Sequence, residues 1–394
     1  MDLFGRRYDD AEPIRLRIES GKISQVTPWL CAPEPGQSWP WIAPGLFDIQ
    51  VNGYRGQEFS SPSLTAEKVA AIVHAYDAFG VTRSCPTLFS ESFEVLEHSL
   101  NVIATACESR PDVARRVAGI HLEGPYLSKE DGPRGAHAAA HCRPPDWEEF
   151  QRLQEASGGR VRMVTMSVEF EQSPAFIRRV VATGAIVAIG HTSCDSAHIQ
   201  AAVDAGATIS THLGNGSHLT MPIFPNYIWD QLAEDRLAAS LIADGHHLPP
   251  DVVKTFVRAK TPERCILVSD MSGFAGCPPG RYRTRQGDLE ILPNGSLVVA
   301  GQRELLAGAS EPIGTDVANA MWWAGLDLEK AIRMATIQPS QLLGLEPRGL
   351  QPEEPADLVL FDLFPPVAGE GPPRFGVRST VVGGELGWGT PWHP

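Results

Sequence analysis

Short apolar runs that end in polar side chains recur eight times through the middle of the sequence, and segments with helical periodicity lie between them. Residues 64–79 are one such segment, because their apolar side chains fall on one face of a helix, and residues 196–205 are another. The apolar runs, which we expect to form strands, occupy residues 45–51, 80–87, 116–123, 161–167, 185–191, 207–212, 238–245 and 264–270. Eight β/α repeats predict an α/β protein built on a (β/α)8 TIM barrel.

The two ends of the chain instead alternate apolar and polar residues with a period of two, which is typical of strands. Residues 14–26 carry a Gly-Lys turn between two such stretches and predict a hairpin. Residues 356–362 and 377–386 predict two further strands, separated by the Pro- and Gly-rich residues 365–376. We predict that the two ends pair into one small β-sandwich domain.

A Pro-rich connector with Pro33, Pro35 and Pro40 separates the first strands from the barrel. At 394 residues the chain exceeds the ~250 residues typical of one TIM barrel, which leaves room for the second domain. The predicted units are residues 1–43 and 351–394 for the two parts of the sandwich and residues 44–350 for the barrel.

Residues capable of acid–base chemistry or metal binding lie where the predicted strands end, at the face that carries the active site in TIM barrels. These residues are Gln50, Glu123, His191, His212, His247 and Asp270. Two imidazoles and one carboxylate form a recurring catalytic zinc set with one open position, and Glu123, His191 and His212 supply it. Taken singly, each residue has a structural alternative, such as a hydrogen-bonded histidine or a capping carboxylate. Their occurrence together at successive strand ends favours a functional site.

Charge and cysteine content narrow the classes of partner and compartment. The net charge of −14 argues against nucleic acid and anionic membranes as partners. No apolar run approaches the ~20 residues that a membrane span needs, and no signal-peptide core is evident. The seven cysteines are scattered without a C-x-x-C pair, which is typical of reduced thiols in a cytoplasmic protein.

Several short motifs together make the chain resemble a known family over nearly its whole length. They are PGLFDIQVNG (44–53), HLEGP (121–125), GAH (135–137), GHT (190–192), THLGN (211–215), IADGHH (242–247), VSD (268–270) and LAG (306–308). The chain resembles the N-acetylglucosamine-6-phosphate deacetylases of the amidohydrolase superfamily. The resemblance implies a metal-dependent amide hydrolase that deacetylates an N-acetylated amino sugar, a small-molecule substrate.

The first predicted strand bears on the number of metal ions. In many metal-dependent hydrolases this strand ends in His-x-His, which binds one ion, whereas here the two positions hold Gln50 and Asn52. Some members of the family have Gln at this place and bind one metal ion through the Glu and the two His. Amides compete poorly for zinc beside imidazole and carboxylate. We therefore expect one divalent ion, zinc in preference, and a Gln50 that hydrogen-bonds towards the metal water or the groups around it.

The resemblance also implies roles for the other residues of the site. Asp270 takes a proton from the attacking water and hands it to the departing amine, and His137 polarises the acyl carbonyl. Asn215, Gly216 and His247 match contacts to the sugar, and Gln50 is placed with them as a substrate-binding residue. Exposed histidines without a catalytic role are the alternative for His137 and His247.

One position departs from the family pattern. Phosphate-binding members carry an Arg eleven residues after the second metal-binding His, and here that position is Ile223, in an apolar and aromatic loop. Such a loop suits a sugar ring, an acyl group or a subunit interface, and we expect a homodimer. With no bidentate Arg contact at this place, we expect a 6-phosphate to change kcat/KM by less than about tenfold. Arg281, after the eighth strand, is a candidate cation that the sequence does not position.

Two other functions stay open at this point. The chain could hydrolyse a different small N-acyl compound, such as an N-acyl amino acid, or it could be a metal-free barrel kept as a scaffold. Retention of Glu123, His191, His212 and Asp270 together argues against the scaffold.

Overall fold

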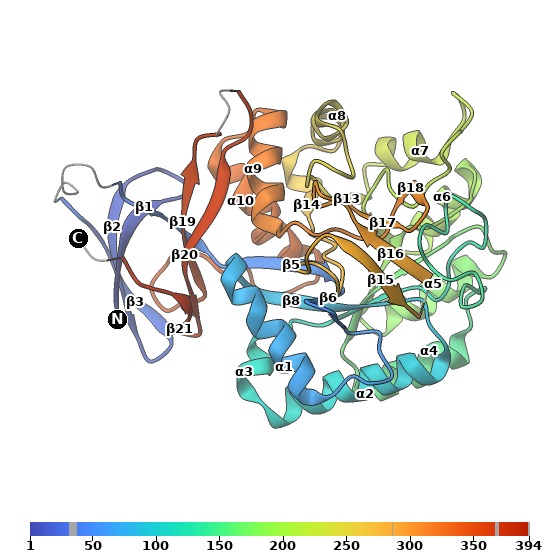
Figure 1. Ribbon diagram of the computed structural model, residues 1–394, viewed down its shortest axis with the longest axis horizontal. Coiled ribbons are helices and arrows are strands. Elements are labelled where there is room, and N and C mark those ends of the chain that lie inside the picture. The colour runs from blue at the N-terminus through green and yellow to red at the C-terminus, as the bar shows by residue number, and fades with distance from the viewer. Residues whose placement is uncertain (31–37, 286, 367–369, 393–394) are drawn as a thin grey trace.

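The computed structural model describes residues 1–30, 38–285, 287–366 and 370–392 (Figure 1). Pro33, Pro35 and Cys31 of the predicted connector, and residues 367–369 of the predicted Pro- and Gly-rich stretch, lie outside the described residues.

The middle of the chain forms a parallel eight-stranded barrel. Its strands are β5 (Leu46–Val51), β8 (Val81–Phe89), β9 (Ile120–Glu123), β10 (Val161–Met166), β11 (Ile186–Ile189), β12 (Ala207–Ser210), β13 (Ala238–Leu241) and β14 (Cys265–Leu267), and each pairs with the next in chain order. The sheet closes just beyond β5 and β14, where the Asp270 N–H donates to the Gln50 carbonyl (3.0 Å) and the Asn52 N–H to the Met271 carbonyl (2.7 Å). All eight strands predicted from the apolar runs are thereby confirmed.

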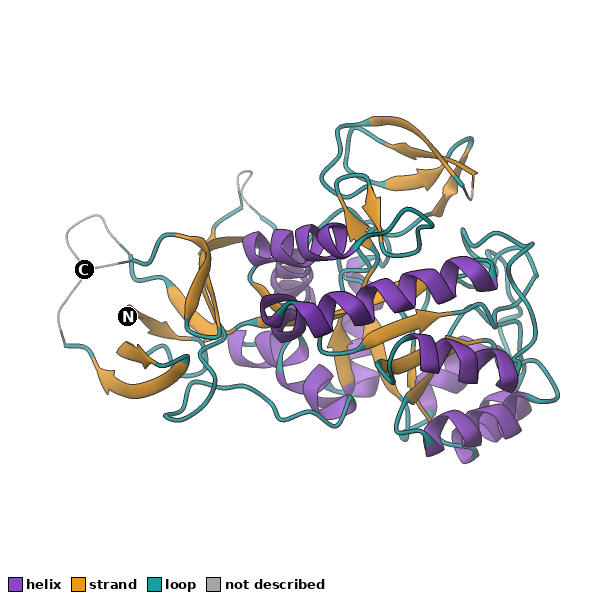
Figure 2. Cartoon of the chain, turned by 90° about the horizontal axis from the view of Figure 1, so that it is seen from below, coloured by secondary structure: helices purple, strands orange, loops and turns teal. Residues whose placement is uncertain are grey.

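Helices surround the barrel (Figures 1 and 2). They are α1 (Ala66–Ala75), η1 (Tyr76–Phe79), α2 (Phe93–Ser109), α3 (Pro111–Arg116), α4 (Trp147–Ala156), α5 (Ser173–Ala182), α6 (Ser196–Asp204), α7 (Tyr227–Ala233), α8 (Pro250–Lys260), η2 (Pro262–Arg264), α9 (Ile313–Ala324), α10 (Leu328–Met334) and α11 (Ile337–Leu342). Short polar side chains start many of them: Thr65 caps α1, Ser92 caps α2 and Asn226 caps α7 by accepting a backbone N–H of the first turn. The two helical segments predicted from periodicity correspond to α1 with η1 and to α6.

The two ends of the chain form one seven-stranded sheet in the order β21-β20-β19-β4-β1-β2-β3. Its strands are β1 (Asp2–Arg7), β2 (Pro13–Glu19), β3 (Lys22–Pro28), β4 (Trp41–Pro44), β19 (Leu358–Phe364), β20 (Arg374–Val382) and β21 (Glu385–Gly389). The antiparallel pairing of β4 with β19 joins the N-terminal strands to the C-terminal ones. This agrees with the expected fold class, while the division at residues 43 and 350 stays a prediction.

A second small sheet, which was not predicted from the sequence, follows the eighth barrel strand. It is antiparallel and consists of β15 (Gly280–Thr284), β16 (Gly287–Ile291), β17 (Leu297–Val299) and β18 (Gln302–Leu306). Figure 2 shows that this insert sheet, residues 280–306, projects from one end of the barrel. A two-stranded ribbon, β6 (Gly53–Tyr54) with β7 (Gln57–Glu58), follows the first barrel strand.

Apolar side chains from several barrel strands fill the barrel interior. A buried cluster contains Phe47, Ile49, Cys85, Met163, Ala188, Ile209 and Ile266. This packing is typical of TIM barrels, in which inward residues of alternate strands stack in layers. Among the described residues, no helix combines the length and the apolar character that crossing a membrane requires.

Candidate metal centre and active site

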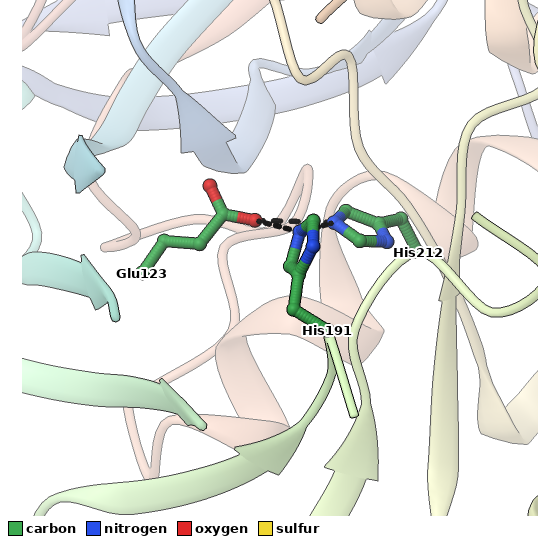
Figure 3. Close-up of side chains that lie close together, drawn as sticks. All are labelled: Glu123, His191 and His212. Carbon is green, nitrogen blue, oxygen red and sulfur yellow. Dashed lines mark hydrogen bonds and ion pairs between the residues drawn. The ribbon is translucent and has the colours of Figure 1, made fainter. Parts of the chain in front are cut away.

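Three buried side chains from the ends of β9, β11 and β12 converge at the carboxyl end of the barrel (Figure 3). Glu123 ends β9, His191 follows β11, and His212 follows β12. The Glu123 Oε1 lies 3.3 Å from the His191 Nε2 and 3.1 Å from the His212 Nε2, and the two Nε2 atoms are 3.0 Å apart. The structure therefore brings together the three residues that the sequence analysis named as metal ligands.

The chemistry of this set fits a divalent cation. The His191 Nδ1 lies 2.9 Å from the Pro133 carbonyl, which can only accept, so Nδ1 carries the proton and the Nε2 lone pair is available to a cation beside His212 and Glu123. Burial alone raises the pKa of Glu123, but the neighbouring His191 and His212 lower it well below its usual range. A metal ion bound here would supply a Lewis acid for an acyl oxygen and a water molecule.

The backbone at these strand ends is unusual. His191, His212 and Asp270 have φ values of 52°, 28° and 49°, in the left-handed region that residues other than glycine rarely adopt. Such conformations concentrate at functional sites, where the surrounding structure holds them against their local cost. The backbone therefore supports the assignment of these residues to a site.

Asp270 is buried, and it lines the same cavity as the three metal-ligand candidates. The Asn52 Nδ2 donates to the Asp270 Oδ1 (2.8 Å), which leaves Oδ2 for the cavity. Burial, and after it the negative charge of Glu123, raises the pKa of Asp270 to about 8. A carboxyl group at this place can take a proton from a water molecule and return it. This contact between Asn52 and Asp270 was not predicted from the sequence.

Gln50 lies behind the metal-ligand candidates. Its Nε2 donates to the Glu123 Oε1 (2.9 Å), so it contacts a group of the metal set. The side chain is fully buried and is not among the described residues that line the cavity. The structure thus places Gln50 next to Glu123, and its predicted contact with the substrate stays a prediction.

A cavity of about 1110 Å³ opens above these residues, and it is also lined by His137, Asn215, Gly216 and His247. The His137 Nδ1 accepts from the Ser90 N–H (3.3 Å), which places the ring proton on Nε2. Burial is the main reason that the pKa of His137 falls to about 3. His137 is therefore a neutral hydrogen-bond donor.

Asn215 and Gly216 lie on the loop that follows His212. The Asn215 Nδ2 donates to the His212 carbonyl (3.3 Å), and Gly216 has a φ of 56°. A Cβ at Gly216 would lie 2.6 Å from the His191 Nδ1, so only glycine lets this loop approach the imidazole.

His247 lines the cavity from the turn after β13. The His247 Nδ1 lies 2.8 Å from the Asp244 Oδ2, and both side chains are almost fully buried. Burial raises the pKa of Asp244, but the neighbouring His247 and two backbone N–H groups lower it overall. The neighbouring His246 also lines the cavity, and its Nδ1 lies 3.0 Å from the Ser296 Oγ of the insert sheet. No role was predicted for Asp244, which lies in the IADGHH motif, or for Ser296.

The two positions considered for a phosphate contact, Ile223 and Arg281, lie away from the cavity, and other arginines line it. Ile223 is 77 % exposed and Arg281, paired with Glu290 at 3.6 Å, points to solvent, and neither is among the described residues that line the cavity. The arginines that do line it are Arg134, Arg285 and Arg303. Arg285 pairs with the buried Glu91 (3.3 Å).

Comparisons with known proteins agree with this geometry. The family model described as "Amidohydrolase family" matches residues 41–387. The chain is 34 % identical to N-acetylglucosamine-6-phosphate deacetylase of Bos taurus, over 88 % of this chain and 83 % of that one. It is 30 % identical to N-acetylgalactosamine-6-phosphate deacetylase of Shewanella sp. (strain ANA-3), over 77 % of this chain and 74 % of that one.

A solved structure extends the likeness to three dimensions. The crystal structure of N-acetyl-D-glucosamine-6-phosphate deacetylase from Mycobacterium smegmatis superposes with a TM-score of 0.85, at 28 % identity, over 98 % of this chain and 99 % of that one. The chain therefore belongs to the amidohydrolase family, in the group of enzymes named N-acetylglucosamine-6-phosphate deacetylases.

Proposed function

We propose that this chain hydrolyses the acetamide group of an N-acetylated amino sugar to acetate and the free amine. The observation that carries the proposal is the buried set of Glu123, His191 and His212 in one cavity with Asp270. The printed names of the relatives supply the class of substrate.

Each residue of the site is assigned a part in this reaction, and the contacts of Asp270 and His137 support theirs. The Asp270 Oδ2 accepts a proton from the attacking water and later gives it to the departing nitrogen, while Asn52 holds Oδ1. The His137 Nε2–H donates to the carbonyl oxygen as negative charge develops there. His247, with Asn215 and Gly216, binds the hydroxyl groups of the sugar.

We also propose one divalent ion per chain, with zinc preferred. Amide side chains, Gln50 and Asn52, occupy the positions where a second ion would need imidazoles, and both amides are engaged by carboxylates of the site. Elemental analysis of protein purified without chelator should give one equivalent, and His191→Ala or His212→Ala should lose it. Two tightly held ions would contradict the one-metal site, and no ion at all would favour a scaffold.

A substrate panel tests the reaction. Acetate release is measured on N-acetylglucosamine, on N-acetylglucosamine 6-phosphate and N-acetylgalactosamine 6-phosphate, and on an N-acyl amino acid. Turnover of the sugars and not of the amino acid supports the proposal. The reverse result would favour the other open function, hydrolysis of a different N-acyl compound.

The same panel tests the expected tolerance for the phosphate. Ile223 faces solvent and Arg285 is engaged by Glu91, so we keep the expectation that the 6-phosphate changes kcat/KM by less than about tenfold. A preference above a hundredfold would contradict it. Arg303→Ala would then show whether this guanidinium, which lines the cavity, is responsible.

We further propose a homodimer in the cytoplasm. Exposed apolar side chains after β12 support the dimer, and the thiols of the described cysteines, which are all free, support a reducing compartment.

A further inference from the structure

A buried carboxylate lies directly behind a histidine that faces the cavity. Asp244 is buried and is not among the described residues that line the cavity, whereas His247 lines it. The Asp244 Oδ2 and the His247 Nδ1 are 2.8 Å apart. Asp244 therefore does not face a ligand directly, and its Oδ2 contacts the imidazole of His247.

The turn that carries this pair is fixed from two sides. The Asp244 Oδ1 accepts the backbone N–H groups of His246 (2.8 Å) and His247 (2.9 Å). From α9, the Asp316 Oδ1 accepts the Ala243 N–H (2.5 Å), and the Asn319 Nδ2 donates to the Ala243 carbonyl (2.7 Å). The carboxylate can therefore rotate little, and its Oδ2 stays aimed at the imidazole.

This geometry determines which ring nitrogen carries the proton. An ionised carboxylate only accepts hydrogen bonds, so the His247 Nδ1 must be the N–H, and the Nε2 of the neutral ring keeps its lone pair. The adjacent His246 contrasts with this arrangement, because the hydroxyl of Ser296 can donate or accept and does not select a tautomer.

We propose that Asp244 is a positioning residue that holds His247 in the Nδ1–H tautomer, so that Nε2 accepts a hydrogen bond from a hydroxyl group of the sugar. The part that concerns the sugar rests on the proposed function. The tautomer itself does not, and it can be measured without any substrate.

Asp244→Asn gives a sharp test, because the turn orients the new amide. The two backbone N–H groups require the oxygen at the Oδ1 position, which leaves the NH2 group facing the His247 Nδ1. The amide then donates to Nδ1, and the ring must change to the Nε2–H tautomer. The isosteric variant should thus invert the proton position with little change in shape.

The measurement is histidine ¹⁵N NMR of the metal-loaded protein labelled with ¹⁵N-histidine, with the His247 signals assigned from His247→Gln. We expect the Nδ1–H tautomer in the wild type and the Nε2–H tautomer in Asp244→Asn. Ser296→Ala is the matched control and should leave the His247 signals unchanged. An Nε2–H tautomer in the wild type would overturn the proposal, and this result does not depend on the folding of any variant.

Kinetics test the consequence for binding. Asp244→Asn should raise KM for N-acetylglucosamine about tenfold with kcat nearly unchanged, and the double variant Asp244→Asn/His247→Gln should be no worse than His247→Gln alone. Additive losses in the double variant would mean that Asp244 acts independently of His247 and would overturn the proposal. If the wild type deacetylated none of the sugars, the proposed function would fail, while the NMR result would still decide the tautomer.

Discussion

Asn52 holds one oxygen of Asp270, and the Asp270 side chain lines the cavity. Asp270→Asn keeps the shape of the side chain and removes its capacity to take a proton. We expect metal content to remain at the wild-type level and kcat to fall on the order of 10²–10⁴-fold, as for loss of a general acid–base group. Elemental analysis and turnover on N-acetylglucosamine check this. Near-wild-type turnover would assign the proton transfer to another group.

Asp48 is a buried carboxyl whose titration should affect stability. Burial raises its pKa from 3.8 to about 7, although Ser269 and the Gln50 N–H lower it in part. Because the folded protein then holds the proton more tightly than the unfolded chain, this group lowers the free energy of unfolding as the pH rises from about 4 to about 7. Asp48→Asn cannot ionise, and its amide can keep the same contacts. The free energy of unfolding of the Asp48→Asn variant should therefore fall less between pH 5 and pH 8 than that of the wild type.

Denaturant unfolding of both proteins at the two pH values measures this difference. Ser296→Ala, on the insert sheet, is a suitable control because it contains no titratable group and should follow the wild type. An identical pH dependence in Asp48→Asn and in the wild type would show that Asp48 does not titrate in this range.

The residues that could be predicted from the sequence are those whose role depends on their place along the chain. Glu123, His191 and His212 end barrel strands, and the barrel geometry alone brings them together. Asn52 and Asp244 were given no role because their importance comes from a partner. Asn52 and Asp270 are 218 residues apart in the sequence, so their contact depends on the fold. Asp244 precedes a glycine and two histidines, a pattern typical of an ordinary turn.

At the scale of elements, the barrel strands were predictable because each is a short apolar run buried on both faces. The insert sheet was missed although residues 280–306 contain alternating residues and Gly-containing turns. The first two strands, β15 and β16, are mostly exposed or partly buried, and Arg281 and Arg283 on β15 are exposed, so no strong apolar signal marks them. The insert sheet matters for the candidate site because Arg285, Ser296 and Arg303, on this sheet or its turns, line the cavity.

One ion pair ties the insert sheet to the barrel. Arg285, just beyond β15, pairs with Glu91, which precedes α2 and is buried. Arg285→Gln should free this edge of the sheet and increase the rate at which trypsin cleaves after Arg283. A half-exposed pair contributes at most about 1 kcal/mol, so the increase should be about fivefold or less.

Mass spectrometry of the fragments measures this rate. The matched control is Glu290→Gln, which removes the Arg281–Glu290 pair within the sheet and leaves the contact to the barrel intact. Equal rates in Arg285→Gln and Glu290→Gln would mean that the Arg285–Glu91 pair does not restrain the sheet.

At the scale of the whole molecule, the terminal sheet and the barrel meet at a buried ion pair. The Arg116 Nη2, at the end of α3, lies 2.6 Å from the Asp77 Oδ2, in η1. The Thr380 Oγ of β20 donates to the Asp77 carbonyl (2.6 Å). A Cβ at Gly387 of β21 would lie 2.5 Å from the Asp77 Oδ2, so β21 also approaches the Asp77 carboxylate closely. The pairing of the two ends could be predicted from their alternation, but this contact between units depends on the tertiary structure.

The apolar surface after β12 leads to a prediction about assembly. Leu219, Ile223, Phe224 and Trp229 are exposed by 74, 77, 77 and 47 %, within eleven residues of sequence beside the cavity mouth. Such a concentration of large apolar side chains is typical of a protein interface. We expect light scattering to give twice the 42.7 kDa of one chain, and Phe224→Asp to shift the protein to the monomer by placing a charge in the interface. Leu30→Asp is the control, because Leu30 is 95 % exposed at the far terminal sheet and should leave the dimer intact. A single-chain mass for the wild type, or the same loss of dimer in Leu30→Asp, would contradict an interface at residues 219–229.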